Sequence, residues 1–140
     1  MSAVKIVLIG AGSRSFGPAM VKDIVLSEPL STLDVKLVLM DRIPDAIAGI
    51  KQYACDLFAT FKRPCAVVGT TDLTQALEGA DYVITAIEVD RYLHWSEDFH
   101  IPRKYGFRQV YGENGGPGGL FHALRNMIPV VEIAQTMERL

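Results

Sequence analysis

The sequence predicts an α/β fold built on a doubly wound parallel sheet. Three observations carry this prediction. Short apolar runs rich in β-branched residues alternate with segments of helical periodicity, the first run (Val4–Ile9) leads directly into a glycine-rich turn, and the second (Val35–Met40) ends at Asp41. A continuous apolar run is typical of a strand buried on both faces of a parallel sheet. Strands that alternate with helices favour right-handed crossovers between parallel neighbours.

The segment between these two strands contains the first predicted helix. Residues 18–26 have apolar side chains at helical spacing, and Pro18 stands where a first helical turn tolerates proline. Residues 28–32 have turn-forming composition and predict a turn before the second strand. Strand, glycine-rich turn, helix and strand together predict one βαβ unit.

The same alternation continues after Asp41. Pro44 opens a long helix with one apolar face, and Pro64 stops it. Three shorter segments follow, and their apolar patterns predict in order a strand, a helix and a strand: residues 66–68, 73–77 and 82–87.

The last third of the chain is less regular. Residues 91–105 are mixed and aromatic and predict no regular element, and residues 109–119 contain too many glycines for anything but a loop. Residues 120–140 regain helical periodicity, in which Pro129 predicts a kink or a late start. Because no repeat or linker interrupts the chain, we expect residues 1–140 to form one domain.

Composition restricts the functional classes. The chain has 140 residues, of which 49% are hydrophobic, so it is long and apolar enough to bury a core. A net charge of -2 without a basic stripe argues against nucleic acid as a partner. No apolar run approaches the roughly 18 residues of a membrane span, so a cytoplasmic protein with no membrane partner is the simplest expectation.

The cysteines and histidines do not predict a metal site within this chain. Cys55 and Cys65 lack the spacing of paired ligands, and inert thiols are expected. The three histidines lack the i, i+4 spacing of a helical metal site: His94, His100 and His122.

The glycine-rich turn and Asp41 predict a dinucleotide site. Gly10 and Gly12 lack a Cβ, so the turn that continues into Ser13 can bring backbone N–H groups to a pyrophosphate. Asp41 can accept both hydroxyls of a ribose and would repel the extra phosphate of NADP, so NAD is favoured. Ser15 occupies the position of the third glycine in the usual pattern. Two alternatives stay open: a purely steric role for the glycines, and a helix-capping role for Asp41.

Three further positions are candidates for the site. The strand that begins at Tyr82 should end beside the cofactor, where Thr85, Ala86 and Ile87 would line the nicotinamide, unless they are simple core residues. Glu113 is a carboxylate in a glycine-rich loop just before a helix, and a plain surface turn is its alternative. Trp95 can stack on a pyranose or pack in the core.

Several motifs together resemble glycoside hydrolase family four, in that family's order and across nearly all of the chain. They are GAGS with Phe16, Asp41, Thr71-Asp72, DYVITAI, residues 101–106 and ENGGPGG. This family is an exception to hydrolysis by a pair of carboxylates. The resemblance implies that NAD transiently oxidises the 3-hydroxyl of the sugar, that the aglycone is then eliminated, and that a divalent metal, usually manganese, stabilises the enediolate.

The resemblance also implies roles for particular residues. Glu113 matches the carboxylate held near a tyrosine base, while that base and the cysteine and histidine metal ligands belong to later sequence. The isolated chain is therefore expected to be inactive. The resemblance also implies that the complete enzyme is a homo-oligomer. Trp95 stands where members that act on 6-phospho sugars carry an arginine, so an unphosphorylated glycoside is expected, unless Arg91 or Arg103 substitutes.

Two other functions remain open at this point. A lactate- or malate-type dehydrogenase shares the same beginning and would produce a net redox change in NAD. A nucleotide-binding domain without catalytic activity is also compatible with the fold.

Overall fold

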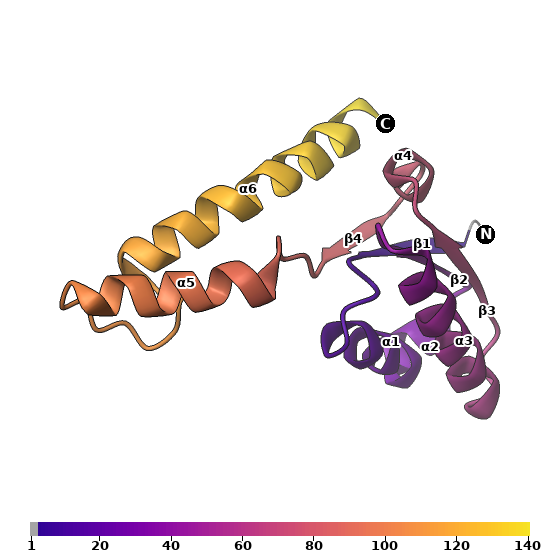
Figure 1. Cartoon of the computed structure of the whole chain (residues 1–140). Helices are drawn as coiled ribbons and strands as arrows, with labels where there is room; N and C mark the ends of the chain where they lie inside the picture. The colour runs from indigo at the N-terminus through magenta and orange to yellow at the C-terminus, as the bar shows by residue number, and fades with distance from the viewer. Residues whose placement is uncertain (1–2) are drawn as a thin grey trace. The chain divides into compact units, whose positions relative to one another are not determined.

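The computed structural model describes residues 3–140 and divides into two compact units. The first unit comprises Met1–Ile87 with Thr136–Leu140, and the second comprises Glu88–Gln135. Figure 1 shows the strands β1 to β4 in the first unit and the helices α5 and α6 after them. That the whole of residues 1–140 acts as one NAD-binding domain remains a prediction.

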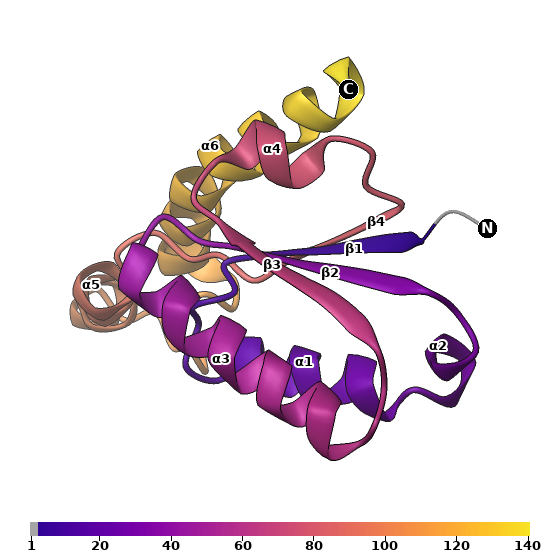
Figure 2. The ribbon, with the colours of Figure 1, turned by 90° about the vertical axis from the view of Figure 1, so that its right-hand side faces the viewer.

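The first unit is built on a parallel sheet, as predicted. Within the described residues it has four strands in the order β3-β2-β1-β4. Their bounds are β1 Val4–Ile9, β2 Val35–Met40, β3 Cys65–Thr70 and β4 Tyr82–Thr85. Strand order runs outward from β1 to β3 and then returns to the other side of β1, so the topology reverses between β1 and β4 (Figure 2). In doubly wound sheets, ligands bind at such a reversal, outside the carboxyl ends of the strands.

Helices cover both faces of this sheet. Figure 2 shows α1 (Phe16–Leu26) and α3 (Pro44–Thr60) on one face and α4 (Leu73–Leu77) on the other. The core lies between the sheet and the pair α1 and α3. Its largest fully buried side chains are aliphatic: Leu8, Leu37, Leu39, Val21 and Val25. Strands that are apolar on both faces therefore match a sheet covered on both sides.

Several boundaries in the first unit differ from the predicted ones. The predicted turn at residues 28–32 contains a short helix, α2 (Glu28–Ser31), because the Ser27 hydroxyl accepts a hydrogen bond from the Leu30 N–H and Pro29 stands at its start. β3 is longer than its short apolar run, because it pairs in register with β2 along its full length. β4 ends at Thr85, two residues before the predicted end.

The second unit contains a helix that was not predicted. Residues 91–105 are mostly helical as α5 (Arg91–Lys104), and α6 (Gly116–Arg139) begins before residue 120 and contains Pro129. α5 has no apolar stripe: its buried residues are Asp98 and Pro102. Periodicity of apolar residues could not reveal a helix that buries a charge.

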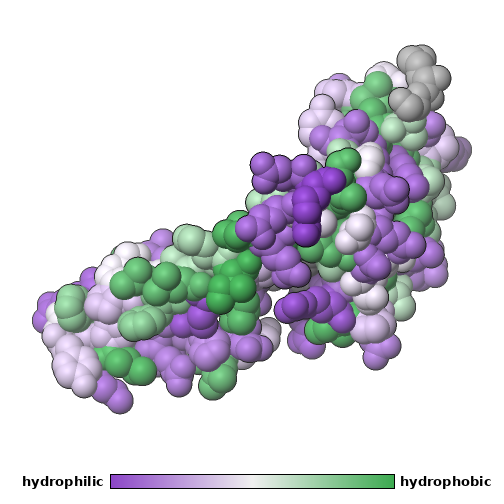
Figure 3. All heavy atoms as spheres, turned by 90° about the horizontal axis from the view of Figure 1, so that it is seen from above, coloured by the Kyte–Doolittle hydropathy of each residue, from purple (hydrophilic) through white to green (hydrophobic). Residues whose placement is uncertain are grey.

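α6 leaves many apolar side chains exposed. Figure 3 shows hydrophobic surface gathered over this part of the chain. More than half of each of these side chains is accessible to solvent: Leu120, Phe121, Leu124, Met127 and Ile128. Among residues 3–140, no helix is both long enough and apolar enough to cross a membrane.

Candidate functional site

The carboxyl ends of three neighbouring strands lie side by side in the first unit. Ile9 at the end of β1 pairs with Met40 of β2 and with Thr85 of β4. The segments that leave these ends are the glycine-rich turn, Asp41 and the Ala86–Ile87 pair. The structure therefore brings the predicted cofactor residues to one edge of the sheet, although their contact with a cofactor remains a prediction.

Gly10 can only be glycine at its position. Its φ is +80°, and a Cβ there would lie 2.2 Å from the carbonyl oxygen of Ala86. Its N–H donates to the Met40 carbonyl at 2.9 Å, while the Ala86 N–H donates to the Ile9 carbonyl at 2.8 Å. Gly10 thus lets the turn pass directly against the segment that follows β4.

Asp41 holds the turn through its carboxylate. Oδ2 accepts a hydrogen bond from the Gly12 N–H at 2.8 Å, and Oδ1 accepts one from the Ile43 N–H at 3.1 Å. A Cβ on Gly12 would lie 2.5 Å from the Cβ of Ala46. Ile43, and not Asp41, is the N-cap of α3. A carboxylate offers about four acceptor positions, so Asp41 retains acceptors for the hydroxyls of a ribose.

Gly17 performs the packing usually done by the third glycine of the pattern. It is buried in the first turn of α1, and a Cβ there would lie 2.1 Å from the Ala11 carbonyl oxygen. The spacing of the usual pattern points instead to Ser15, which is exposed. The sequence signal for this role is a glycine directly before Pro18, the first residue of the predicted helix. The start of that helix is the part that packs closest to the first strand.

Ser13 makes hydrogen bonds to the turn before it and to the first residue of α1. Its N–H donates to the Gly10 carbonyl at 3.0 Å, and its hydroxyl accepts a hydrogen bond from the Phe16 N–H at 3.3 Å. A hollow beside this turn is lined by residues of the turn and of α3, among them Gly12, Ser13, Arg14, Gly49 and Tyr53. The turn thus has open space next to its backbone, as a bound pyrophosphate requires.

Glu113 lies in the loop between α5 and α6 of the second unit. Its Oε2 accepts a hydrogen bond from the indole N–H of Trp95. Two glycines, Gly112 in the loop and Gly118 in the first turn of α6, allow these segments to lie directly on α5. A Cβ on Gly118 would lie 2.1 Å from the Asp98 carbonyl oxygen, and one on Gly112 would lie 2.9 Å from the Trp95 carbonyl oxygen. The predicted site residues Trp95 and Glu113 are therefore in direct contact, while their catalytic and substrate-binding roles remain predictions.

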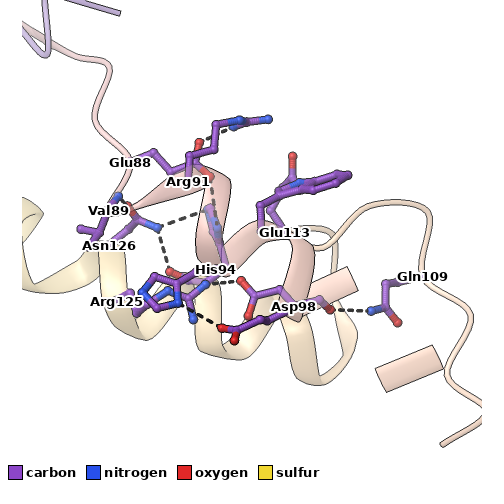
Figure 4. A network of polar contacts seen from close by, with 12 residues as sticks. Glu88, Val89, Arg91, His94, Asp98, Gln109, Glu113, Arg125 and Asn126 are labelled. Carbon is purple, nitrogen blue, oxygen red and sulfur yellow. Dashed lines mark hydrogen bonds and ion pairs between the residues drawn. The ribbon is translucent and has the colours of Figure 1, made fainter. Parts of the chain in front are cut away.

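Charged side chains join α5 to α6 (Figure 4). Asp98, of which only 6% is exposed, forms an ion pair with Arg125. The Glu88 carboxylate, at the start of this unit, accepts a hydrogen bond from Arg91 and lies 3.8 Å from Nδ1 of His122. The hydrogen bond to Glu88 raises the pKa of Arg91. Sequence analysis did not select Asp98, Arg125 or Glu88, because their pairing depends on how two helices dock.

The described residues do not by themselves form a metal site. Within residues 3–140 no three of the histidine, cysteine, aspartate and glutamate side chains are grouped so that they could hold an ion. Cys55 is exposed and Cys65 is half-buried, and burial raises the pKa of the Cys65 thiol.

Known proteins resemble this chain over nearly its whole length. A family model described as family 4 glycosyl hydrolase matches residues 5–140. An alpha-glucosidase of Erwinia rhapontici is 48% identical over 132 residues, which are 94% of this chain and 29% of that enzyme. A 6-phospho-beta glucosidase of Thermotoga maritima, solved with manganese, NAD+ and glucose-6-phosphate, has a TM-score of 0.81 and 26% identity over 97% of this chain and 32% of that chain.

A dehydrogenase resembles the chain less. A lactate dehydrogenase of Cryptosporidium parvum has a TM-score of 0.51 and 22% identity and covers 64% of this chain and 26% of that one, which shows a shared fold alone. The chain spans less than a third of the length of the alpha-glucosidase and of the 6-phospho-beta glucosidase. Because the family model matches almost every residue and agrees with the motifs, the chain belongs to family 4 of the glycosyl hydrolases.

Proposed function

We propose that this chain binds NAD at the carboxyl ends of β1, β2 and β4, as the NAD-binding part of a glycosidase that works by redox elimination. The observation that carries the proposal is the meeting of the Gly10 turn, Asp41 and Ala86 at one edge of the sheet, where the strand order reverses. The NAD+ bound to the Thermotoga maritima relative supports the choice of ligand.

Different residues of this edge would bind different parts of NAD. The N–H groups of residues 10–13 already donate within the chain, so the residues that follow the turn and the start of α1 would hold the pyrophosphate. The remaining acceptors of Asp41 would bind the adenosine ribose. Thr85, Ala86 and Ile87 would border the nicotinamide. When bound, NAD would accept the hydride of C3 as the 3-hydroxyl of the sugar is oxidised to a ketone, and would later return it, so the reaction would have no net redox change.

The remaining chemistry needs residues outside this chain. Manganese, which the Thermotoga maritima structure holds, would need ligands from the later sequence that the family resemblance implies, since the described residues hold no group of three side chains that could bind an ion. Glu113 would contact a base supplied from there. A carboxylate next to a phenol raises the proton affinity of that phenol, which adjusts it for proton transfer. We therefore expect the isolated chain to bind NAD without cleaving glycosides.

Calorimetric titration of the chain with NAD and with NADP tests the cofactor proposal. We expect tighter binding of NAD, and we expect Asp41→Ala to weaken it by roughly 1–3 kcal/mol, since ribose hydroxyls lose a charged partner. Asp45→Ala is the matched control, because Asp45 is an exposed acid in the first turn of α3. Equal affinities for NAD and NADP, or equal effects of the two substitutions, would contradict the proposal.

The substrate is proposed to be an unphosphorylated glycoside. An indole at position 95 cannot replace the bidentate contact of a guanidinium with phosphate. In the native enzyme, unphosphorylated aryl glycosides should be cleaved faster than their 6-phospho forms, without accumulation of NADH. Preference for the 6-phospho form would show that Arg91 or Arg103 binds the phosphate, and net NADH formation would identify a dehydrogenase.

A further inference from the structure

Three side chains form a column along one side of α5. Trp95, Phe99 and Arg103 follow one another at intervals of four residues, which places them on the same face of the helix. The Trp95 and Phe99 rings are stacked, with centroids 5.6 Å apart and planes at 3°. The Arg103 guanidinium carbon lies 4.7 Å from the centre of the Phe99 ring. This packing fixes the plane of the indole and occupies one of its two faces.

The free edge of the indole points at Glu113. Tryptophan has a single N–H donor and no acceptor, and here it donates to a carboxylate oxygen, the charge-assisted kind of hydrogen bond. Without such a contact, a glutamate in a loop would sample many rotamers. The positive charge of Arg91 also acts on Glu113, but Arg91 hydrogen-bonds to Glu88. Trp95 is therefore the side chain that sets the orientation of the Glu113 carboxylate.

We propose that Trp95 is a positioning residue for Glu113, which it holds in the orientation needed to act on the catalytic base. The inference rests on the proposed function of Glu113. It differs from the expected role of Trp95 as a platform for sugar, which would depend on the exposed face of the ring. Positioning depends on the N–H group, so replacing that group while keeping an aromatic ring separates the two roles.

The contact itself can be tested by NMR. Trp95 is the only tryptophan of the chain, so a ¹H–¹⁵N spectrum of the 140-residue protein contains one indole resonance. Glu113→Gln should move this resonance upfield, because a neutral amide oxygen is a weaker acceptor than a carboxylate. The matched control is Glu97→Gln on the same helix, where Glu97 contacts His94 and should leave the resonance in place.

A second variant covers the case in which Glu113→Gln does not fold. Glu113→Asp keeps the charge but shortens the side chain by one methylene, and it should displace the resonance in the same direction. Dispersion of the backbone amide resonances reports whether each variant is folded. An indole resonance that stays in place in both folded variants would overturn the proposal.

Kinetics of the native enzyme test the consequence of the contact. Trp95→Phe removes the donor and keeps a smaller aromatic ring, and we expect about a tenfold lower kcat with an unchanged KM for the glycoside, within the range of proton-transfer effects. Tyr92→Phe, at an exposed position of α5, is the control. The double variant Trp95→Phe/Glu113→Gln should be no slower than Glu113→Gln alone, because both act on one group.

The outcomes separate this inference from the proposed function. Additive losses in the double variant, or a raised KM with normal kcat in Trp95→Phe, would overturn positioning and favour the sugar platform. A Glu113→Gln enzyme with normal kcat would instead refute the catalytic role of Glu113, while the indole resonance would still report whether the contact exists.

Discussion

Different kinds of contact hold together the proposed cofactor edge of the first unit, formed by residues 10–13, Asp41 and Ala86, and the α5–α6 pair of the second unit. At the cofactor edge, the contacts of Gly10 and Gly12 are made by backbone groups, and Asp41 is the one side chain that joins them. In the second unit, side chains make the polar contacts, such as Asp98 with Arg125 and Trp95 with Glu113, beside the close approach of Gly118 to the Asp98 carbonyl. Backbone contacts require particular conformations, whereas side-chain contacts require particular partners.

This difference predicts how each region responds to substitution. A change at the cofactor edge should be harmful whenever it adds atoms, because the backbone has no room for a Cβ. A change in the second unit should be harmful when it removes a partner and leaves a buried charge uncompensated. Adding a side chain therefore tests the close backbone approaches, at Gly10 in the first unit and at Gly118 in the second, whereas removing one tests the ion pair of the second unit.

The largest effect is expected at Asp98. Asp98→Ala leaves the Arg125 guanidinium without its carboxylate inside the second unit, and losing one partner of a buried pair costs about 3–5 kcal/mol. Chemical denaturation, together with hydrogen exchange of the α5 amides, measures this loss. Glu97→Ala is the control, because Glu97 is 54% exposed and its contact with His94 should contribute less than about 1 kcal/mol. Similar losses in the two variants would show that the pair does not hold the helices together.

A somewhat smaller loss is expected at Gly10. Gly10→Val adds a side chain at a φ of +80° and against the Ala86 carbonyl, so it should lower the free energy of unfolding by about 3 kcal/mol and abolish NAD binding. Gly49→Ala is the opposite control, since no atom lies within 4 Å of the added Cβ in the middle of α3. It should raise stability by roughly 0.5–1 kcal/mol. Thermal melts without NAD compare the stabilities of the two variants, and melts with NAD test Gly10→Val alone, because Gly49 lines the hollow beside the turn. A stable, NAD-binding Gly10→Val protein would contradict the description of this edge.

The smallest effect on the free-energy scale is expected in catalysis. In the native enzyme, Glu113→Gln should lower kcat about 100-fold, which corresponds to roughly 2.7 kcal/mol, while the affinity for NAD stays unchanged. A helix-capping role for Glu113 would instead lower the melting temperature and leave kcat per folded molecule intact. Measuring kcat against pH for both proteins decides between the two roles, since a catalytic Glu113 also shifts the basic limb of the profile.

Most of the first unit could be predicted from sequence. β1, β2 and α4 have the predicted bounds, and Gly10, Gly12 and Asp41 meet at the predicted edge. Each of these features leaves a local pattern: an apolar run, a helical period, or a residue without a Cβ. Gly17 shows the limit of such patterns, because its role depends on how closely α1 approaches the Ala11 carbonyl.

The sequence by itself determined the α/β class, the order of strands and helices in the first unit, the meeting of Gly10, Gly12 and Asp41 at one sheet edge, and the family, because each follows from local hydrophobic periodicity or from motifs in a fixed order. Tertiary structure alone decided that α5 is a helix with a buried Asp98, and that the Trp95 indole meets the Glu113 carboxylate. A local pattern records whether a side chain is polar. It does not record which distant partner makes burying that side chain favourable, because that depends on the docking of one segment against another.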